Sequence, residues 1–124
     1  MNNLFFTQDF ETEDSHKYQP GSYIITRVVG VVFDGRQEVI ARLFVGEKIL
    51  LKREPTNPYD RNAIRVERID GSQIGYINRH LASILAPFFD PHNQPVAALV
   101  HSLTGNHCPG YALGVVISFY IPRF

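Results

Sequence analysis

Residues 53–66 read REPTNPYDRNAIRV, a rigid polar loop that leads into a strand. Pro55 and Pro58 fix two φ angles and hold the loop open at little entropic cost. Short polar side chains and one flat ring stand on this frame: Asn57, Tyr59, Asp60 and Asn62. Such a loop can be a well-made turn whose Asn and Asp side chains bond their own backbone. It can also be a binding loop that presents these groups to a ligand, although composition alone favours the turn.

Strands are predicted on both sides of this loop, because β-branched and aromatic residues dominate there. The expected strands are Tyr23–Phe33, Glu47–Arg53, Ala63–Ile69, Gln73–Ile77, Pro95–Leu103 and Tyr111–Ile121, with a further short strand at Leu4–Phe6. Asp70-Gly71 is a strong hairpin signal between two of them.

Two short helices are also predicted. In the first, Asp34 can cap the N-terminus while Gln37 reaches back to it. The second follows the cap residue Asn78 and spans Arg79 to about Phe89, with Pro87 ending or kinking it. Strands outnumber helices and the connections are short. The sequence therefore predicts a mainly β fold, a small OB-like β-barrel of about six strands flanked by two short α-helices.

The chain has the size of one domain, with 124 residues of which 44% are hydrophobic. Residues 1–21 hold four acidic residues and one lysine, and we expect an acidic, loosely ordered arm there. The barrel domain is expected at residues 22–124, which keep 11 basic and 8 acidic residues. That mild surplus suits a small footprint on nucleic acid, and it suits an ordinary mixed surface equally well.

Several classes of protein are disfavoured by the sequence. No stretch reaches the roughly 18 apolar residues of a membrane span, and the start lacks a signal-peptide pattern, so we expect a cytoplasmic protein, nucleoid-associated if bacterial. No phosphate-binding P-loop, nucleophile elbow or paired-carboxylate motif occurs, so we expect no enzyme. His101, His107 and Cys108 have poor spacing for zinc, which needs three or four converging ligands, so neither a metal nor a cofactor is expected.

Four segments, in order, resemble the HIRAN domain family. They are Val29–Phe33, the loop Glu54–Ile64, the strand Gln73–Ile77 with Leu81-Ala82 behind it, and an apolar strand ending near Phe119. The Asn-Pro-Tyr-Asp-x-Asn-Ala core of the loop is the most specific part, and the resemblance covers about residues 23–121. It implies an OB-like barrel flanked by two helices. It also implies binding of single-stranded DNA at its free 3′-hydroxyl end, in DNA repair or replication-fork processing.

By this resemblance, six residues are expected to contact nucleic acid: Phe33, Asn57, Tyr59, Asp60, Arg79 and Tyr111. Arg36, in the first helix turn, is added as a seventh because it could supply the charge that residues 32–34 lack. The three rings would stack on bases. Asp60, with Asn57 beside it, would accept a hydrogen bond from the terminal hydroxyl and repel a 3′-phosphate. Arg79 matches a phosphate-contacting lysine at a helix start, and Arg36 would add a second cation.

Several of the expected contacts also have a structural alternative. Phe33, Tyr59 and Tyr111 can pack in the core, Asp60 can cap a turn, and Arg79 can be a solvated charge at a helix end.

The first-strand segment departs from the family pattern. Fork-remodelling members carry an arginine and two aromatics where this chain has Val32, Phe33 and Asp34. One stacking ring and one phosphate contact are therefore missing, which predicts weaker DNA binding or another ligand. A protein-protein interaction or regulatory module on the same fold stays open as the alternative. A separate helicase, nuclease or other repair protein would be the partner, and the oligomeric state is left open.

Overall fold

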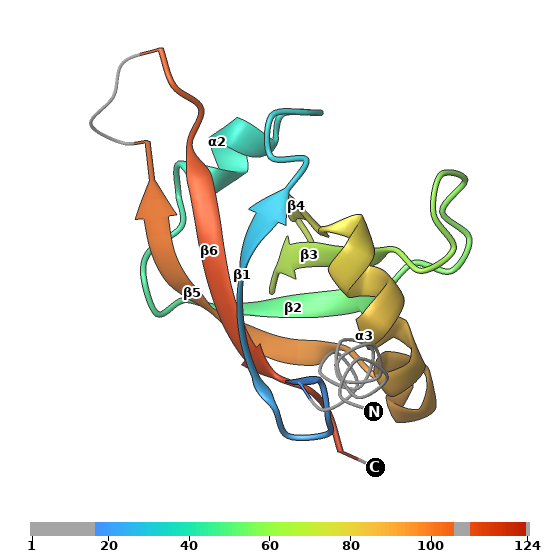
Figure 1. Ribbon diagram of the computed structural model, residues 1–124. Coiled ribbons are helices and arrows are strands. Elements are labelled where there is room, and N and C mark those ends of the chain that lie inside the picture. Colours follow the sequence, from blue (N-terminus) through green and yellow to red (C-terminus); the bar gives the residue numbers. More distant parts are fainter. Residues whose placement is uncertain (1–16, 106–109, 124) are drawn as a thin grey trace, which may run out of the picture.

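The computed structural model describes residues 17–105 and 110–123, and within them six antiparallel strands close into a barrel (Figure 1). The strands are β1 (Tyr23–Val29), β2 (Lys48–Arg53), β3 (Ile64–Arg68), β4 (Gln73–Ile77), β5 (Val96–Thr104) and β6 (Gly114–Tyr120). Their order around the barrel is β1-β4-β3-β2-β5-β6, and β6 pairs back onto β1. The predicted mainly β barrel with two helices is confirmed.

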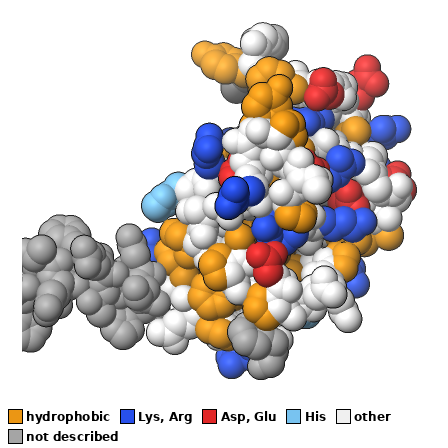
Figure 2. Space-filling view, turned by 90° about the vertical axis from the view of Figure 1, so that its right-hand side faces the viewer, with side chains coloured by type: hydrophobic (Ala, Val, Ile, Leu, Met, Phe, Trp, Pro, Cys, Tyr) orange, Lys and Arg blue, Asp and Glu red, His pale blue; other side chains and the backbone are white. Residues whose placement is uncertain are grey.

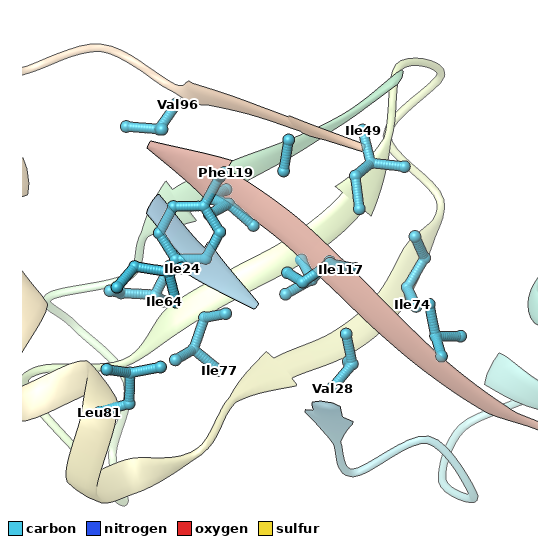
Figure 3. Packing of buried hydrophobic residues seen from close by; sticks show 14 of the residues in the cluster. Ile24, Val28, Ile49, Ile64, Ile74, Ile77, Leu81, Val96, Ile117 and Phe119 are labelled. Atoms are coloured by element: carbon cyan, nitrogen blue, oxygen red, sulfur yellow. The ribbon is translucent and has the colours of Figure 1, made fainter. Parts of the chain in front are cut away.

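The core lies inside the barrel, where side chains from all six strands meet. On β3, for example, Ile64 and Val66 are fully buried whereas Arg65 between them is partly exposed. Figure 3 shows side chains of this core from opposite strands, with Leu81 added from helix α3 (Arg79–His92): Ile24, Val28, Ile49, Ile64, Ile74, Ile77, Leu81, Val96, Ile117 and Phe119. Burial of these apolar groups supplies the main driving force for folding.

The Asp70-Gly71 turn between β3 and β4 forms as predicted, with Gly71 at φ 92°. The Asp70 carboxylate accepts hydrogen bonds from the hydroxyl (2.6 Å) and the backbone N–H (2.9 Å) of Ser72. Since both bonds favour the charged form, they hold the pKa of Asp70 below its ordinary value.

Strand β1 ends earlier than predicted, at Val29 instead of Phe33. Gly30 has φ 69°, and this left-handed conformation turns the chain out of the sheet. Residues 31–35 then form a turn that carries Phe33 to the surface. The apolar run in this segment misled the sequence prediction, because a continuous run also fits a buried strand.

Helix α2 (Arg36–Ile40) also begins differently from the prediction. Asp34 has φ 55°, so it does not adopt the extended conformation of a capping residue, and Gly35 occupies the N-cap position without a side-chain bond. Gln37 does not reach back. Its side chain bonds the carbonyl oxygen of Val31 (2.8 Å) and both backbone groups of Leu113, which ties α2 to the segment before β6.

Helix α3 (Arg79–His92) starts as predicted, because the Asn78 side chain accepts a hydrogen bond from the N–H of Leu81 (2.9 Å). Its end was predicted wrongly. The helix runs through Pro87 to His92, and its C-cap residue Asn93 has φ 54°. Pro87 is exposed, so the carbonyl group that lacks its N–H partner can bond water instead.

Some expectations fall outside the described residues. They include the strand at Leu4–Phe6, most of the acidic arm at residues 1–21, and the metal candidates His107 and Cys108. Within residues 17–105 and 110–123, no three His, Cys, Asp or Glu side chains gather as a metal site. The helices in this same part of the chain are too short or too polar to cross a membrane.

Candidate nucleic-acid interface

Asn57 is the hub of the loop between β2 and β3. Its Oδ1 accepts hydrogen bonds from the backbone N–H groups of Tyr59 (2.8 Å) and Asp60 (3.0 Å). Its Nδ2 donates to Glu54 (2.7 Å) and to the Tyr76 hydroxyl (3.4 Å), and that hydroxyl in turn donates to Glu54 (2.8 Å). Two donated and two accepted bonds use the whole capacity of an amide side chain. Asn57 therefore fixes the loop conformation from within.

Replacing Asn57 by alanine should lower the free energy of unfolding by about 1–3 kcal/mol, because the partly buried Glu54 and Tyr76 groups lose a partner. Chemical denaturation measures this directly. Thr56→Ala is the matched control, since Thr56 is an exposed neighbour on the same loop. Equal stability of the two variants would contradict the role assigned to Asn57.

The fixed loop holds Tyr59 in an exposed position and Asp60 in a partly exposed one. The Tyr59 side chain follows Pro58 and is 85% exposed, which is unusual for so large a ring. Oδ1 of Asp60 accepts from the N–H of Asn62 (2.9 Å) and closes a local turn. Its second oxygen, Oδ2, meets no donor within residues 17–105 and 110–123. Asp60 thus caps a turn and still has an oxygen available to a ligand.

A hollow of about 750 Å³ opens between this loop and the turn after β1, and we name it the β1 pocket. It brings together six of the seven residues expected to contact nucleic acid: Phe33, Arg36, Asn57, Tyr59, Asp60 and Arg79. Val29, Ala63, Tyr76 and Ile77 give the pocket an apolar wall. Residues far apart in sequence thus share one surface, because β4 lies between β1 and β3 in the barrel.

Core packing does not account for either of the two outer aromatic residues. Phe33 is 61% exposed at the rim of the pocket, and Tyr111 is 77% exposed. Tyr111 was expected on the last strand but lies in the loop before β6. It is not among the residues that line the β1 pocket, so its contact with nucleic acid stays a prediction.

The pocket and the barrel can be compared with known proteins. The HIRAN domain family profile matches residues 22–122. This chain belongs to the HIRAN domain family. The helicase-like transcription factor of Oryctolagus cuniculus is 50% identical over 44 residues, which are 36% of this chain and 4% of that protein. The Fanconi-associated nuclease 1 homolog of Arabidopsis thaliana is 36% identical over 83 residues, which are 67% of this chain and 9% of that protein.

Solved HIRAN structures share the fold. The crystal structure of the HIRAN domain of human HLTF aligns with a TM-score of 0.57 and 26% identity, covering 82% of this chain and 77% of that one. The HLTF HIRAN domain in its DNA-bound conformation aligns with a TM-score of 0.51 and 25% identity, covering 88% and 80%. This chain spans less than a tenth of the length of the curated relatives named above.

Arg36 sits deeper in this HIRAN pocket than the sequence suggested. Its side chain is buried, Nη1 donates to the carbonyl oxygen of Gly30 (2.6 Å), and the guanidinium lies 5.4 Å from the centre of the Tyr76 ring. Nη2 lies 3.5 Å from the carboxylate of Asp34, which offsets part of the charge. Arg36 therefore forms part of the pocket wall. Because its guanidinium group is held in place, its charge can act only on a group that enters the pocket.

Tyr76 lines the pocket but is not among the residues predicted from the sequence to form the site. It stacks against Arg36 and joins Asn57 to Glu54, so it connects the loop to the barrel wall. The signal was Gly75 before it: a Cβ there would stand 2.3 Å from the carbonyl oxygen of Val29. Only glycine lets β4 approach β1 this closely, and that approach places Tyr76 at the pocket.

Arg79 is exposed at the first turn of α3, beside the pocket, and no acidic residue shares that turn. It makes no ion pair with any side chain in the described parts of the chain. The expected alternative, a solvated charge at a helix end, fits its exposure. Its place on the pocket rim also leaves it within reach of a bound phosphate.

Proposed function

We propose that this HIRAN domain is a non-catalytic module that binds single-stranded DNA at its free 3′-hydroxyl end, in DNA repair or replication-fork processing. The observation that carries the proposal is the make-up of the β1 pocket. Two exposed rings, Phe33 and Tyr59, line the same pocket as the exposed cation of Arg79. The pocket also holds the carboxylate of Asp60, of which only Oδ1 is used in a turn. The rings could stack on bases, Asp60 could bind the terminal hydroxyl, and Arg79 could bind one phosphate. Together these contacts would recognise the end of a DNA strand.

The rings supply most of the proposed affinity. Base-aromatic stacking contributes about 1–3 kcal/mol per base and tolerates any sequence, because every base has a π-face. When a base covers an exposed ring, apolar surface of both is removed from water, and this stabilises the complex. The rigid loop around Asn57 already holds Tyr59 in place, so little conformational entropy is lost on binding.

Asp60 provides the proposed selectivity for the end. A free 3′-hydroxyl can donate a hydrogen bond to Oδ2, whereas a 3′-phosphate would place like charges together. Hydrogen bonds to charged groups contribute about 1.5–3 kcal/mol, so we expect a preference of at least about tenfold for the hydroxyl end.

The test is binding of a short oligodeoxynucleotide with either a 3′-hydroxyl or a 3′-phosphate, measured by fluorescence anisotropy with the label on the 5′ end. Asp60→Asn keeps the Oδ1 bond to Asn62 but removes the charge, so it should bind both ends with similar affinity. A wild-type domain that binds both ends equally would contradict the proposed selectivity.

The relatives support a binding role over a catalytic one. One is named a helicase-like transcription factor and the other a nuclease, yet the matched segment is under a tenth of each. A domain shared by proteins with such different names is best explained by a shared ligand. The solved HLTF HIRAN domain in its DNA-bound conformation supports DNA as that ligand. We propose that a separate helicase, nuclease or repair protein acts on the end that this domain holds.

A second candidate function, protein contact, has one observation in its favour. Apolar side chains are exposed together on the outer surface of β1, β6 and β5, where Tyr23 pairs with Tyr120, and both Ile25 and Leu99 pair with Ser118. None of the four apolar residues lines the β1 pocket. If no oligonucleotide binds at near-millimolar protein while the fold is intact, this outer surface becomes the leading candidate.

A further inference from the structure

A second, larger hollow of about 1160 Å³ lies on the other side of the β2–β3 loop, between that loop and the first turns of α3. We name it the α3 groove. Arg61 lines it from the loop, and Arg79, His80 and Ser83 line it from the helix. Figure 2 looks onto this side of the molecule and shows Lys and Arg side chains spread among uncharged ones.

The α3 groove and the β1 pocket are neighbours that share part of their lining. Tyr59, Asp60 and Arg79 line both hollows. A strand whose last base lies in the pocket would therefore have to cross the Tyr59 side of the loop before it entered the groove. Arg79 stands where the two hollows meet.

The lining of the groove differs in chemistry from that of the pocket. Apolar and aromatic groups such as Val29 and Phe33 line the pocket, whereas the groove is rich in arginine and polar groups. Arg53 pairs with Asp90 (2.7 Å) at the far side of the groove, so its charge is offset. Arg61 and Arg79 are exposed and make no ion pair with the described residues. Two free cations suit an anionic backbone better than a base.

We infer that the α3 groove binds phosphodiester groups of the same strand whose 3′ end occupies the β1 pocket. This inference rests on the proposed function and extends it, because it assigns Arg61 and His80 to the upstream phosphates. It also explains how the domain could bind DNA without the arginine that fork-remodelling members carry at residues 32–34. The DNA backbone would be held on the α3 side of the loop instead.

Affinity should therefore rise with strand length. Unlabelled oligothymidylates with a free 3′-hydroxyl, from a dinucleotide to an octanucleotide, can be compared by isothermal titration calorimetry at low salt. Each exposed cation-phosphate pair is expected to increase affinity by up to about fivefold. The slope of log affinity against log salt should steepen by about 0.7 for each additional phosphate that the domain neutralises.

The double variant Arg61→Gln, His80→Gln should abolish this rise with length and leave dinucleotide binding unchanged. Lys48→Gln, which removes an exposed cation from β2 outside both hollows, should keep the rise. A wild-type domain that binds all lengths equally, or a double variant whose affinity still rises with length, would overturn the inference and leave the proposed function standing. If the wild-type domain binds neither the dinucleotide nor the octanucleotide, both the inference and the proposed function are overturned.

Discussion

Replacing Tyr59 by alanine should weaken binding of a short 3′-hydroxyl oligodeoxynucleotide by about 5- to 150-fold, the equivalent of losing about 1–3 kcal/mol of stacking. The ring is 85% exposed and makes no contact that the fold needs, so its removal should leave the thermal unfolding temperature nearly unchanged. Fluorescence anisotropy and a thermal melt of the same sample check the two halves of this expectation.

The matched control is Tyr120→Ala. Tyr120 is another exposed tyrosine, on β6, and it lines neither the β1 pocket nor the α3 groove. Its loss should leave DNA affinity unchanged. Equal losses of affinity in the two variants would mean that the β1 pocket does not hold the bases.

Replacing Phe89 by alanine should destabilise the domain by about 3–5 kcal/mol, the range for removal of a buried aromatic ring. Phe89 is 2% exposed on α3, and its ring meets Phe119 of β6 edge to face, with 6.4 Å between centroids. It therefore links the helix to the barrel core. Since small domains are stable by only about 5–15 kcal/mol, the variant should unfold at a much lower denaturant concentration.

Phe44→Ala provides the control of equal size change. Phe44 is 60% exposed, so its removal should change the free energy of unfolding by no more than about 0.5 kcal/mol. A loss below about 1 kcal/mol for Phe89→Ala would show that α3 contributes little to the core. The DNA site would then rest on a helix that the barrel does not need.

The sequence was most informative where one physical rule dominates. β-branched and aromatic residues on either side of the Asp70-Gly71 turn located β3 and β4, and the Asn78 cap located the start of α3, because these signals are local. It failed at the turn after β1, where the apolar run continues past Val29 but Gly30 adopts a positive φ. A run of β-branched residues does not predict such a turn. The positive φ of Gly30 depends on how the chain packs back toward α2, which the local sequence does not show.

The sequence predicted which residues form the candidate site better than it predicted how their side chains are arranged. The loop motif and the resemblance named Tyr59 and Asp60, and the structure places both on the pocket rim. The engagement of Arg36 with Gly30 and Tyr76 depends on contacts between distant segments, which no local pattern reveals. For the same reason the sequence did not suggest the α3 groove, which exists only because α3 packs beside the β2–β3 loop.

The most direct test of the central claim is an NMR titration of the ¹⁵N-labelled domain with a short oligodeoxynucleotide that has a free 3′-hydroxyl. We expect backbone amide shifts to change at residues 30–36, 57, 59–62 and 76–80, which border the β1 pocket and the α3 groove. Amides of Tyr23, Ile25 and Tyr120, on the outer surface of β1 and β6, should stay unchanged. Shift changes confined to that outer surface, or none anywhere at saturating oligonucleotide, would contradict the claim that this pocket holds a DNA end.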